Sequence, residues 1–147
     1  MKNIIGEISV LFSYPKYLVV LAVRWVLAYG FIQPTLMKLQ NMDETAEWFA
    51  LLHIPFSTVM TYIVTVFEAM GVAFLILGLF TRYIATALAF VMIGAIFFVH
   101  LPNGFSVAHN GFEIPLYYLL FLLFLASYGG GKYALDYLFF CKGVEDE

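Results

Sequence analysis

The sequence predicts an all-α integral membrane protein, a four-helix bundle of up-down-up-down topology, and three observations lead to this fold class. Of the 147 residues, 63% are hydrophobic and 12% are charged, whereas soluble domains are about half apolar and a quarter charged. Four apolar stretches approach or reach the roughly 20 residues that a helix needs to cross a bilayer. Short segments with glycine, proline or charged residues separate these stretches. We expect one domain over residues 1–147, with spans at about 17–37, 57–79, 83–99 and 113–128.

The segments outside the spans carry signals of their own. Residues 3–12 have apolar side chains at helical spacing with a polar complement, which predicts a short helix in the membrane interface. Residues 41–53 begin with acidic side chains and end at His53, the order that a helix dipole favours. Residues 78–82 predict a tight turn between the second and third spans, and the glycines at 129–131 are expected to end the fourth.

Positive charges predict which side of the membrane carries the termini. Four spans place both termini on one side, and Lys38 alone of the loop cations falls on the opposite side. Both termini are therefore expected to be cytoplasmic. The cations on the terminus side are Lys2, Lys16, Arg82, Lys132 and Lys142.

The composition also excludes two kinds of chemistry. The Lys and Arg residues are scattered singly and the formal net charge is −3, so the chain has no basic stripe to neutralise phosphates, and we expect no nucleic-acid partner. The single cysteine, Cys141, can form neither an internal disulfide nor a dithiol redox centre within the chain. The lipid bilayer is the expected environment.

Two charged residues lie inside predicted spans, where an ionisable group costs about 2.5–3.5 kcal/mol on insertion scales. Arg24 lies roughly 10 Å from the inner edge of the first span, and Glu68 lies roughly 14 Å from the inner edge of the second. Because these depths are similar and the two spans are adjacent, we expect an Arg24–Glu68 ion pair, with Gly71 allowing the helices to approach closely. Such a pair either takes part in catalysis or only fixes the register of the helices.

A second group of polar residues gathers toward the outer face. His100 ends the third span and Glu113 begins the fourth, so a short loop holds them at nearly the same depth. Histidine and glutamate at a wet membrane boundary are residue types that move protons. We expect His100 and Glu113 to be catalytic, with Lys38 close to them in cofactor binding. The alternative is that these residues simply face water.

The same region offers a metal site as an alternative. All three histidines of the chain fall on the predicted outer side, and imidazole and carboxylate groups bind first-row metal ions. No H-x-x-H pair or other ligand spacing supports such a site, so a metal is not the first prediction. The candidate ligands are His53, His100, His109 and Glu113.

Aromatic side chains on the third and fourth spans are suited to line a slot for a planar, lipid-soluble ring such as a quinone. Phe97 and Tyr117 are the residues that we expect to contact such a ring. The alternative is ordinary packing or an aromatic belt at the membrane interface. The full set comprises Phe97, Phe98, Tyr117, Tyr118, Phe121 and Phe124.

Taken in order, a series of short motifs resembles the DoxX family of bacterial and archaeal membrane proteins. Glycine-proline-glycine is commoner in the last motif, where Gly130 replaces the proline. The resemblance covers residues 17–136. The matching residues are Arg24, Gly30, Lys38, Glu68, Gly71, the run 77–82, His100, the run 111–113 and the run 129–136.

The resemblance implies a four-helix protein of the bacterial or archaeal cytoplasmic (inner) membrane that acts in a redox system with partners. DoxX-like members include a subunit of thiosulfate:quinone oxidoreductase. We therefore expect a membrane redox protein that reacts with a quinone, receives electrons from a partner redox protein and has its site near the outer face. Two alternatives stay open, namely a non-catalytic scaffold for a redox complex and a copper- or iron-handling protein. Glycines on helix faces also allow a homodimer.

Overall fold

The computed structural model describes residues 15–141 of the chain. The expected interfacial helix over residues 3–12 lies outside the described residues, as do Lys2 and Lys142. Within the described part there are helices and turns but no strand, which confirms the all-α class.

Five α-helices make up most of the described chain. They are α2 (Lys16–Gln40), α3 (Met42–Leu51), α4 (Ser57–Leu77), α5 (Thr81–Ala95) and α6 (Glu113–Tyr128). A π-helical turn, Ile96–His100, prolongs α5, and another, Tyr137–Cys141, closes the described chain. Short 3-10 turns at Leu101–Asn103 and Val107–His109 lie in the loop between α5 and α6.

Three helical segments are long and apolar enough to cross a membrane: Lys16–Gln40, Ser57–Leu77 and Thr81–Asn103. They correspond to the first three predicted spans. The fourth, α6, is apolar but has 16 residues, about 24 Å of helix, which is shorter than the usual hydrocarbon core of about 30 Å. The chain is thus a multi-pass membrane protein, while a fourth crossing stays a prediction.

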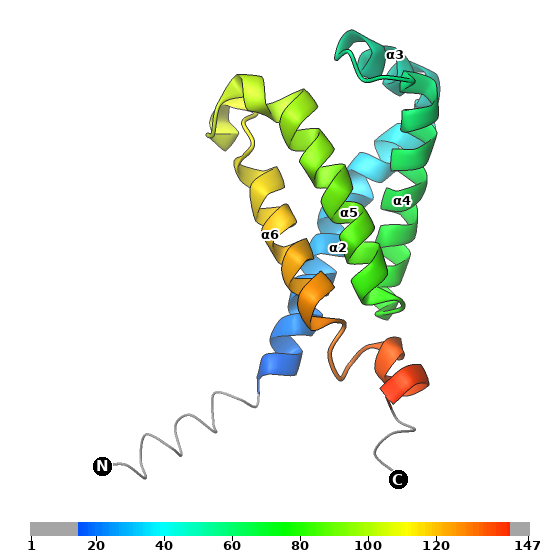
Figure 1. The fold of residues 1–147 in the computed structure, drawn as a ribbon, viewed down its shortest axis with the longest axis vertical. Helices are drawn as coiled ribbons and strands as arrows, with labels where there is room; N and C mark the ends of the chain where they lie inside the picture. The colour runs from blue at the N-terminus through cyan, green and yellow to red at the C-terminus, as the bar shows by residue number, and fades with distance from the viewer. Residues whose placement is uncertain (1–14, 142–147) are drawn as a thin grey trace, which may run out of the picture.

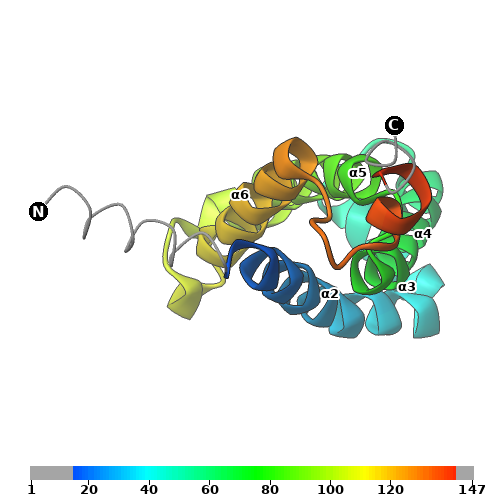
Figure 2. The same ribbon diagram turned by 90° about the horizontal axis from the view of Figure 1, so that it is seen from below.

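The long helices alternate in direction along the chain (Figure 1). Helix α4 packs against both α2 and α5, and α6 packs chiefly against α5. The short α3 lies against the start of α4, at the end of the molecule opposite the described chain ends (Figure 1). Seen from below, the segment that follows α6 crosses beneath the helices toward α4 and α5 (Figure 2).

Leucines and small residues fill the interior, whereas many aromatic side chains face outward. Leu27, Leu75 and Leu88 are completely buried in the core between α2, α4 and α5. Tyr29 and Tyr83, by contrast, are 80% and 78% exposed. A helix surface this apolar is stable when lipid covers it, because the backbone hydrogen bonds are satisfied within each helix.

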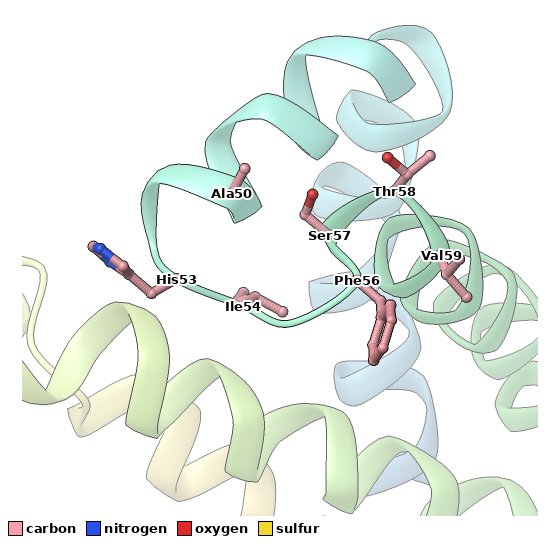
Figure 3. Close-up of a pocket in the computed structure, with 7 residues that line it drawn as sticks. All are labelled: Ala50, His53, Ile54, Phe56, Ser57, Thr58 and Val59. Atoms are coloured by element: carbon pink, nitrogen blue, oxygen red, sulfur yellow. The ribbon is translucent and has the colours of Figure 1, made fainter.

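The link between α3 and α4 turns sharply through two residues with left-handed backbones. His53 has φ 59° and Phe56 has φ 52°, a conformation that side chains with a Cβ rarely adopt. The sharp turn leaves an open hollow of about 580 Å³ between the end of α3 and the start of α4 (Figure 3). Its walls are Ala50, His53, Ile54, Phe56, Ser57, Thr58 and Val59.

The predicted turn between the second and third spans is confirmed, and a distant carboxylate holds it. Gly78 ends α4 with φ 70°, and α5 begins at Thr81. The Asp136 carboxylate accepts hydrogen bonds from the backbone N–H groups of Phe80 (2.6 Å) and Thr81 (2.8 Å). The backbone N–H of Asp136 donates to the Gly78 carbonyl at 3.0 Å. The segment after α6 thus caps the N-terminus of α5, where a negative charge is favourable.

Replacing Asp136 by Ala removes this cap and is expected to lower the free energy of unfolding by about 1 kcal/mol. Thermal unfolding in detergent measures the loss. Asp43→Ala is the matched control, because Asp43 is an exposed acidic residue in the first turn of α3. Equal losses in the two variants would contradict the capping role of Asp136.

Candidate functional site

Arg24 is a fully buried cation whose guanidinium donates four hydrogen bonds, each to a backbone carbonyl group. Its Nε donates to Leu75 O and its Nη2 to Ile76 O, both at 2.9 Å. Its Nη1 donates to Gly130 O and to Tyr133 O, both at 3.1 Å. One side chain of α2 therefore joins the end of α4 to the segment that follows α6.

The end of α4 is a favourable place for this charge. The last carbonyls of a helix lack intrahelical partners and carry the negative end of the helix dipole. A planar guanidinium can donate to several such carbonyls at once. Gly78 is required beside it, since a Cβ there would meet the Arg24 guanidinium. Asp136 supplies a nearby negative charge.

The expected ion pair between Arg24 and Glu68 is therefore wrong. Arg24 binds α4 at Leu75, seven residues beyond Glu68 and about 10 Å further along the helix. The sequence predicted similar membrane depths for Arg24 and Glu68, but Arg24 lies beside the last turn of α4. Gly71 does not serve an α2–α4 approach either, because a Cβ there would meet Leu88 of α5.

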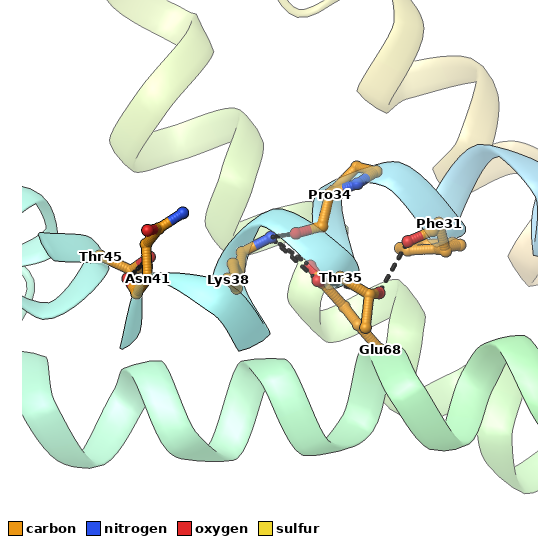
Figure 4. A network of polar contacts seen from close by, with 7 residues as sticks. All are labelled: Phe31, Pro34, Thr35, Lys38, Asn41, Thr45 and Glu68. Atoms are coloured by element: carbon orange, nitrogen blue, oxygen red, sulfur yellow. Dashed lines mark hydrogen bonds and ion pairs between the residues drawn. The ribbon is translucent and has the colours of Figure 1, made fainter. Parts of the chain in front are cut away.

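Glu68 pairs instead with Lys38, near the opposite end of α2 (Figure 4). Lys38 Nζ lies 2.9 Å from Glu68 Oε2 and 3.1 Å from Oε1. The Glu68 side chain is 4% exposed and that of Lys38 is 17% exposed. The Thr35 hydroxyl, one turn before Lys38, donates to Phe31 O at 2.7 Å and lies 3.5 Å from Glu68 Oε2.

A pocket of about 360 Å³ opens beside this ion pair, where α2 passes into α3. Lys38 is both a member of the pair and a wall of the pocket. Its walls combine apolar side chains with a few polar groups, as sites for small ligands do. The walls are Pro34, Met37, Lys38, Asn41, Glu44, Thr45 and Trp48.

His100 and Glu113 both hold the loop between α5 and α6. His100 Nδ1 lies 2.8 Å from Asn110 O. Glu113 accepts from the Val107 N–H through Oε2 at 3.1 Å and from the Tyr117 hydroxyl through Oε1 at 3.2 Å. These contacts give the two residues a structural task, and a catalytic role for them stays a prediction.

The alternative metal site is not assembled. Among residues 15–141, no group of three or more His, Cys, Asp or Glu side chains could hold a metal ion. His53 belongs to the α3–α4 link, away from the α5–α6 loop that carries the other three residues (Figure 1). Within that loop His100 contacts Asn110 O, and Glu113 accepts from the Val107 N–H and the Tyr117 hydroxyl.

The aromatic residues that were expected to line a slot face in different directions, and a ring-binding role for them stays a prediction. Phe97 is 63% exposed, and Tyr117 is also exposed, so both face outward. Tyr118 is the aromatic residue that turns inward, and its ring lies 5.8 Å from that of Phe31. Its hydroxyl sits over Gly30, where a Cβ would collide with it.

The sequence did not predict the pocket at Lys38, although Lys38 itself was expected to bind a cofactor. The signal that was present is the spacing of Thr35 and Lys38, which lie three residues apart on one face of α2. The signal that was missing is the return of α3 along α4, which builds the second wall.

Comparisons with known proteins place these residues in a family context. The family model described as DoxX matches residues 19–101. A Haemophilus influenzae protein described as uncharacterized is 30% identical over 122 residues, 80% of this chain and 81% of its own. A Bacillus subtilis protein named "Putative oxidoreductase CatD" is 32% identical over 101 residues, 69% of this chain and 72% of its own. No solved structure matches the chain significantly.

Removing one partner of the Lys38–Glu68 pair leaves a buried charge without compensation. Lys38→Met and Glu68→Gln are each expected to lower the free energy of unfolding by about 3–5 kcal/mol. The double variant is expected to recover most of that loss. Denaturant titration of the purified protein in detergent measures all three, and simple addition of the two single losses would contradict the pairing.

Arg24→Lys keeps the charge, but a single ammonium cannot donate to four separated carbonyls. The variant is expected to unfold at a clearly lower temperature in detergent. Arg82→Lys is the matched control, since Arg82 is exposed and makes one long contact, 3.5 Å to Tyr128 O. A drop of the same size in both variants would show that the Arg24 contacts do not stabilise the fold.

Proposed function

We propose that this chain, which belongs to the DoxX family, is a quinone-reactive subunit of a membrane redox system, with its site at the Lys38–Glu68 pair. The observation that carries the proposal is that Lys38, paired with the buried Glu68 carboxylate, also lines a pocket between α2 and α3. The name of the Bacillus relative, an oxidoreductase, supports a redox role. The site differs from the His100–Glu113 site that the sequence suggested.

The pocket residues suit the head group of a quinone. The volume of about 360 Å³ lies within the usual range for small-ligand sites, roughly 300–1,000 Å³. Trp48 and Met37 offer apolar surface for a flat ring. Lys38 Nζ has protons to donate to a ring carbonyl, and such charge-assisted hydrogen bonds are strong.

In this proposal the residues of the chain transfer protons to and from the quinone, and they do not transfer electrons. Reduction of a quinone to a quinol takes up two electrons and two protons. Lys38 would hold one proton at Nζ toward the pocket, and Glu68 would take a proton from Nζ or return one across the 2.9 Å contact. Because a single cysteine allows no dithiol within the chain, the electrons would come from a partner redox protein.

The proposal includes a position in the cell membrane. The chain would cross the cytoplasmic membrane four times, with α6 as the short fourth span and both termini in the cytoplasm. Lys38 would then lie near the outer face, as the expected site does. In this arrangement α3 and the α5–α6 loop would face the partner protein.

One observation favours the scaffold role as a second candidate. The α5–α6 loop is folded tightly by its own hydrogen bonds, yet Phe105 and Val107 are more than half exposed on it. A rigid loop with exposed apolar side chains suits docking to another protein. The experiment below separates the two roles, since only the first requires a ligand at Lys38.

Binding of decylubiquinone to the purified protein in lipid nanodiscs tests the proposal. In a Trp25→Phe background Trp48 is the only tryptophan, so its fluorescence is expected to be quenched in a saturable way. Lys38→Met is expected to raise Kd by about tenfold, the effect of one lost charged hydrogen bond.

Glu68→Gln serves as the second test variant and His100→Ala as the control outside the pocket. We expect Glu68→Gln to weaken binding and His100→Ala to leave it unchanged. Absence of saturable quenching would favour the scaffold role, and loss of binding only in His100→Ala would return the site to the α5–α6 loop.

A further inference from the structure

Three exposed cations lie at the end of the molecule where the described chain begins and ends (Figure 1). Lys16 is the first residue of α2, Arg82 is the second residue of α5, and Lys132 lies in the loop that follows α6. In the part of the chain that the structure describes, none of the three forms an ion pair. Lys16 Nζ lies 4.8 Å from the centre of the Tyr17 ring. Arg82 makes one long contact, 3.5 Å to Tyr128 O.

The loop after α6 brings these cations into one region. A Cβ at Gly131 would lie 3.7 Å from the Tyr17 ring, so the loop lies against the first turn of α2 (Figure 2). A Cβ at Gly129 would lie 3.1 Å from Arg82 Nε, so the same loop also contacts the first turn of α5. Lys132 follows directly in this loop. Three segments far apart in the sequence thus present positive charge around one short loop.

Helix stability does not explain the positions of two of these cations. Lys16 and Arg82 lie in the first turns of α2 and α5, where the positive end of the helix dipole disfavours a cation. Neither first turn contains an acidic residue. A cation and a helix N-terminus at the same place both attract an anion, so these two positions favour a negatively charged ligand.

The negative groups at this end are already bound within the fold. Asp136 is the acidic side chain that the structure places here, and its oxygens accept from the backbone N–H groups of Phe80 and Thr81. Two carbonyls at the end of α4 accept from Arg24. The other described acidic residues belong to α3, the middle of α4 and the start of α6. The described charge at this end is therefore positive in excess.

These cations lie at the depth of lipid headgroups. Lys16 and Arg82 stand at the starts of two segments that are long and apolar enough to cross a membrane. The ends of such segments lie at the boundary between membrane and water. Tyr83 and Tyr133, each the residue next to one of these cations, are 78% and 57% exposed, and exposed tyrosines are typical of this boundary. Lipid phosphate is the anion that the chain meets at this depth.

We propose that the loop at residues 129–132, together with Lys16 and Arg82, binds the headgroup of an anionic phospholipid. The headgroup holds the segment after α6 against the first turns of α2 and α5. The same segment carries Asp136, which caps α5, and two carbonyls that accept from Arg24. A lipid bound here thus stabilises the packing of that segment on the helices. The site is separate from the α2–α3 pocket, so it does not depend on the proposed function.

Native mass spectrometry of the purified protein tests the site, with phosphatidylglycerol and phosphatidylcholine offered at equal concentration. We expect phosphatidylglycerol to be retained preferentially. Arg82→Gln and Lys132→Gln are each expected to raise its Kd by about fivefold, the effect of one basic residue near an anionic lipid surface. Equal retention of the two lipids would overturn the site and would leave an acidic segment of a partner protein as its occupant.

A control at the opposite end separates the site from net charge. Glu47→Gln removes one exposed negative charge from α3, so the double variant Arg82→Gln/Glu47→Gln has the net charge of the unsubstituted chain. We expect the double variant to bind phosphatidylglycerol as weakly as Arg82→Gln does, and Glu47→Gln alone to bind it like the unsubstituted chain. Recovery of the affinity in the double variant would overturn the site, because attraction to net charge would then explain the binding.

The thermal midpoint in detergent gives an independent result. Added phosphatidylglycerol is expected to raise the midpoint, because a ligand that binds only the folded chain stabilises it. Lys132→Gln is expected to lose most of this gain, and phosphatidylcholine is expected to give none. An equal rise with both lipids would contradict the proposal. Neither measurement involves a quinone, so a failure to bind decylubiquinone would refute the proposed function without changing this test.

Discussion

The ion pair between Lys38 and Glu68 is the interaction on which the half of the structure that carries α3 depends. A carboxylate in the middle of an apolar helix is tolerable only when a cation reaches it, and Lys38 Nζ does so at 2.9 Å. This contact fixes the end of α2 against α4. Since α3 begins at Met42, four residues after Lys38, the same contact also sets where α3 starts and where the pocket opens.

At the other end of the bundle a buried cation is satisfied in a different way. Within residues 15–141 Arg24 has no direct ion pair, and it donates to four carbonyl oxygens from two segments far apart in the sequence. Arg24 and Lys38 are 14 residues apart on α2, about 21 Å along the helix. Two cations of α2 thus hold it to α4. Arg24 donates to backbone carbonyls at the end of α4, and Lys38 pairs with the Glu68 carboxylate. Most of the motif residues that resemble the DoxX family lie near these two points or in the α5–α6 loop, whereas Gly30 and Gly71 pack against Tyr118 and Leu88.

Much of the fold was predictable because it follows from local rules. Runs of apolar residues gave the helices, and the turn at residues 78–82 and the end of α6 before Gly129 followed from glycine positions. The start of α3 matched its acidic first turn. These features depend on residues that are neighbours in sequence.

The partners of the charges were not predictable in the same way. A buried charge is expected to pair with the opposite charge, and for this reason Arg24 was predicted to pair with Glu68. Its actual partners are backbone carbonyl groups, which every residue has and which no sequence pattern marks. Glu68 pairs with Lys38, which the predicted topology placed in the loops on the side opposite the termini. The pocket requires α3 to turn back along α4 through His53 and Phe56. Both residues have left-handed backbones, and neither is a glycine that would have indicated this conformation in the sequence.

Chemical cross-linking in native membranes tests the central claim, that Glu68 lies beside Lys38 and not beside Arg24. In a Cys141→Ser background, cysteines replace Lys38 and Glu68 in one variant and Arg24 and Glu68 in another, and a short bifunctional thiol reagent takes the place of the two long side chains. Because the Lys38 and Glu68 side chains meet at 2.9 Å, whereas Arg24 binds α4 about 10 Å further along the helix, the account predicts a rapid cross-link in the first variant and a much slower one in the second. Cross-linking of the Arg24 pair instead would contradict the account.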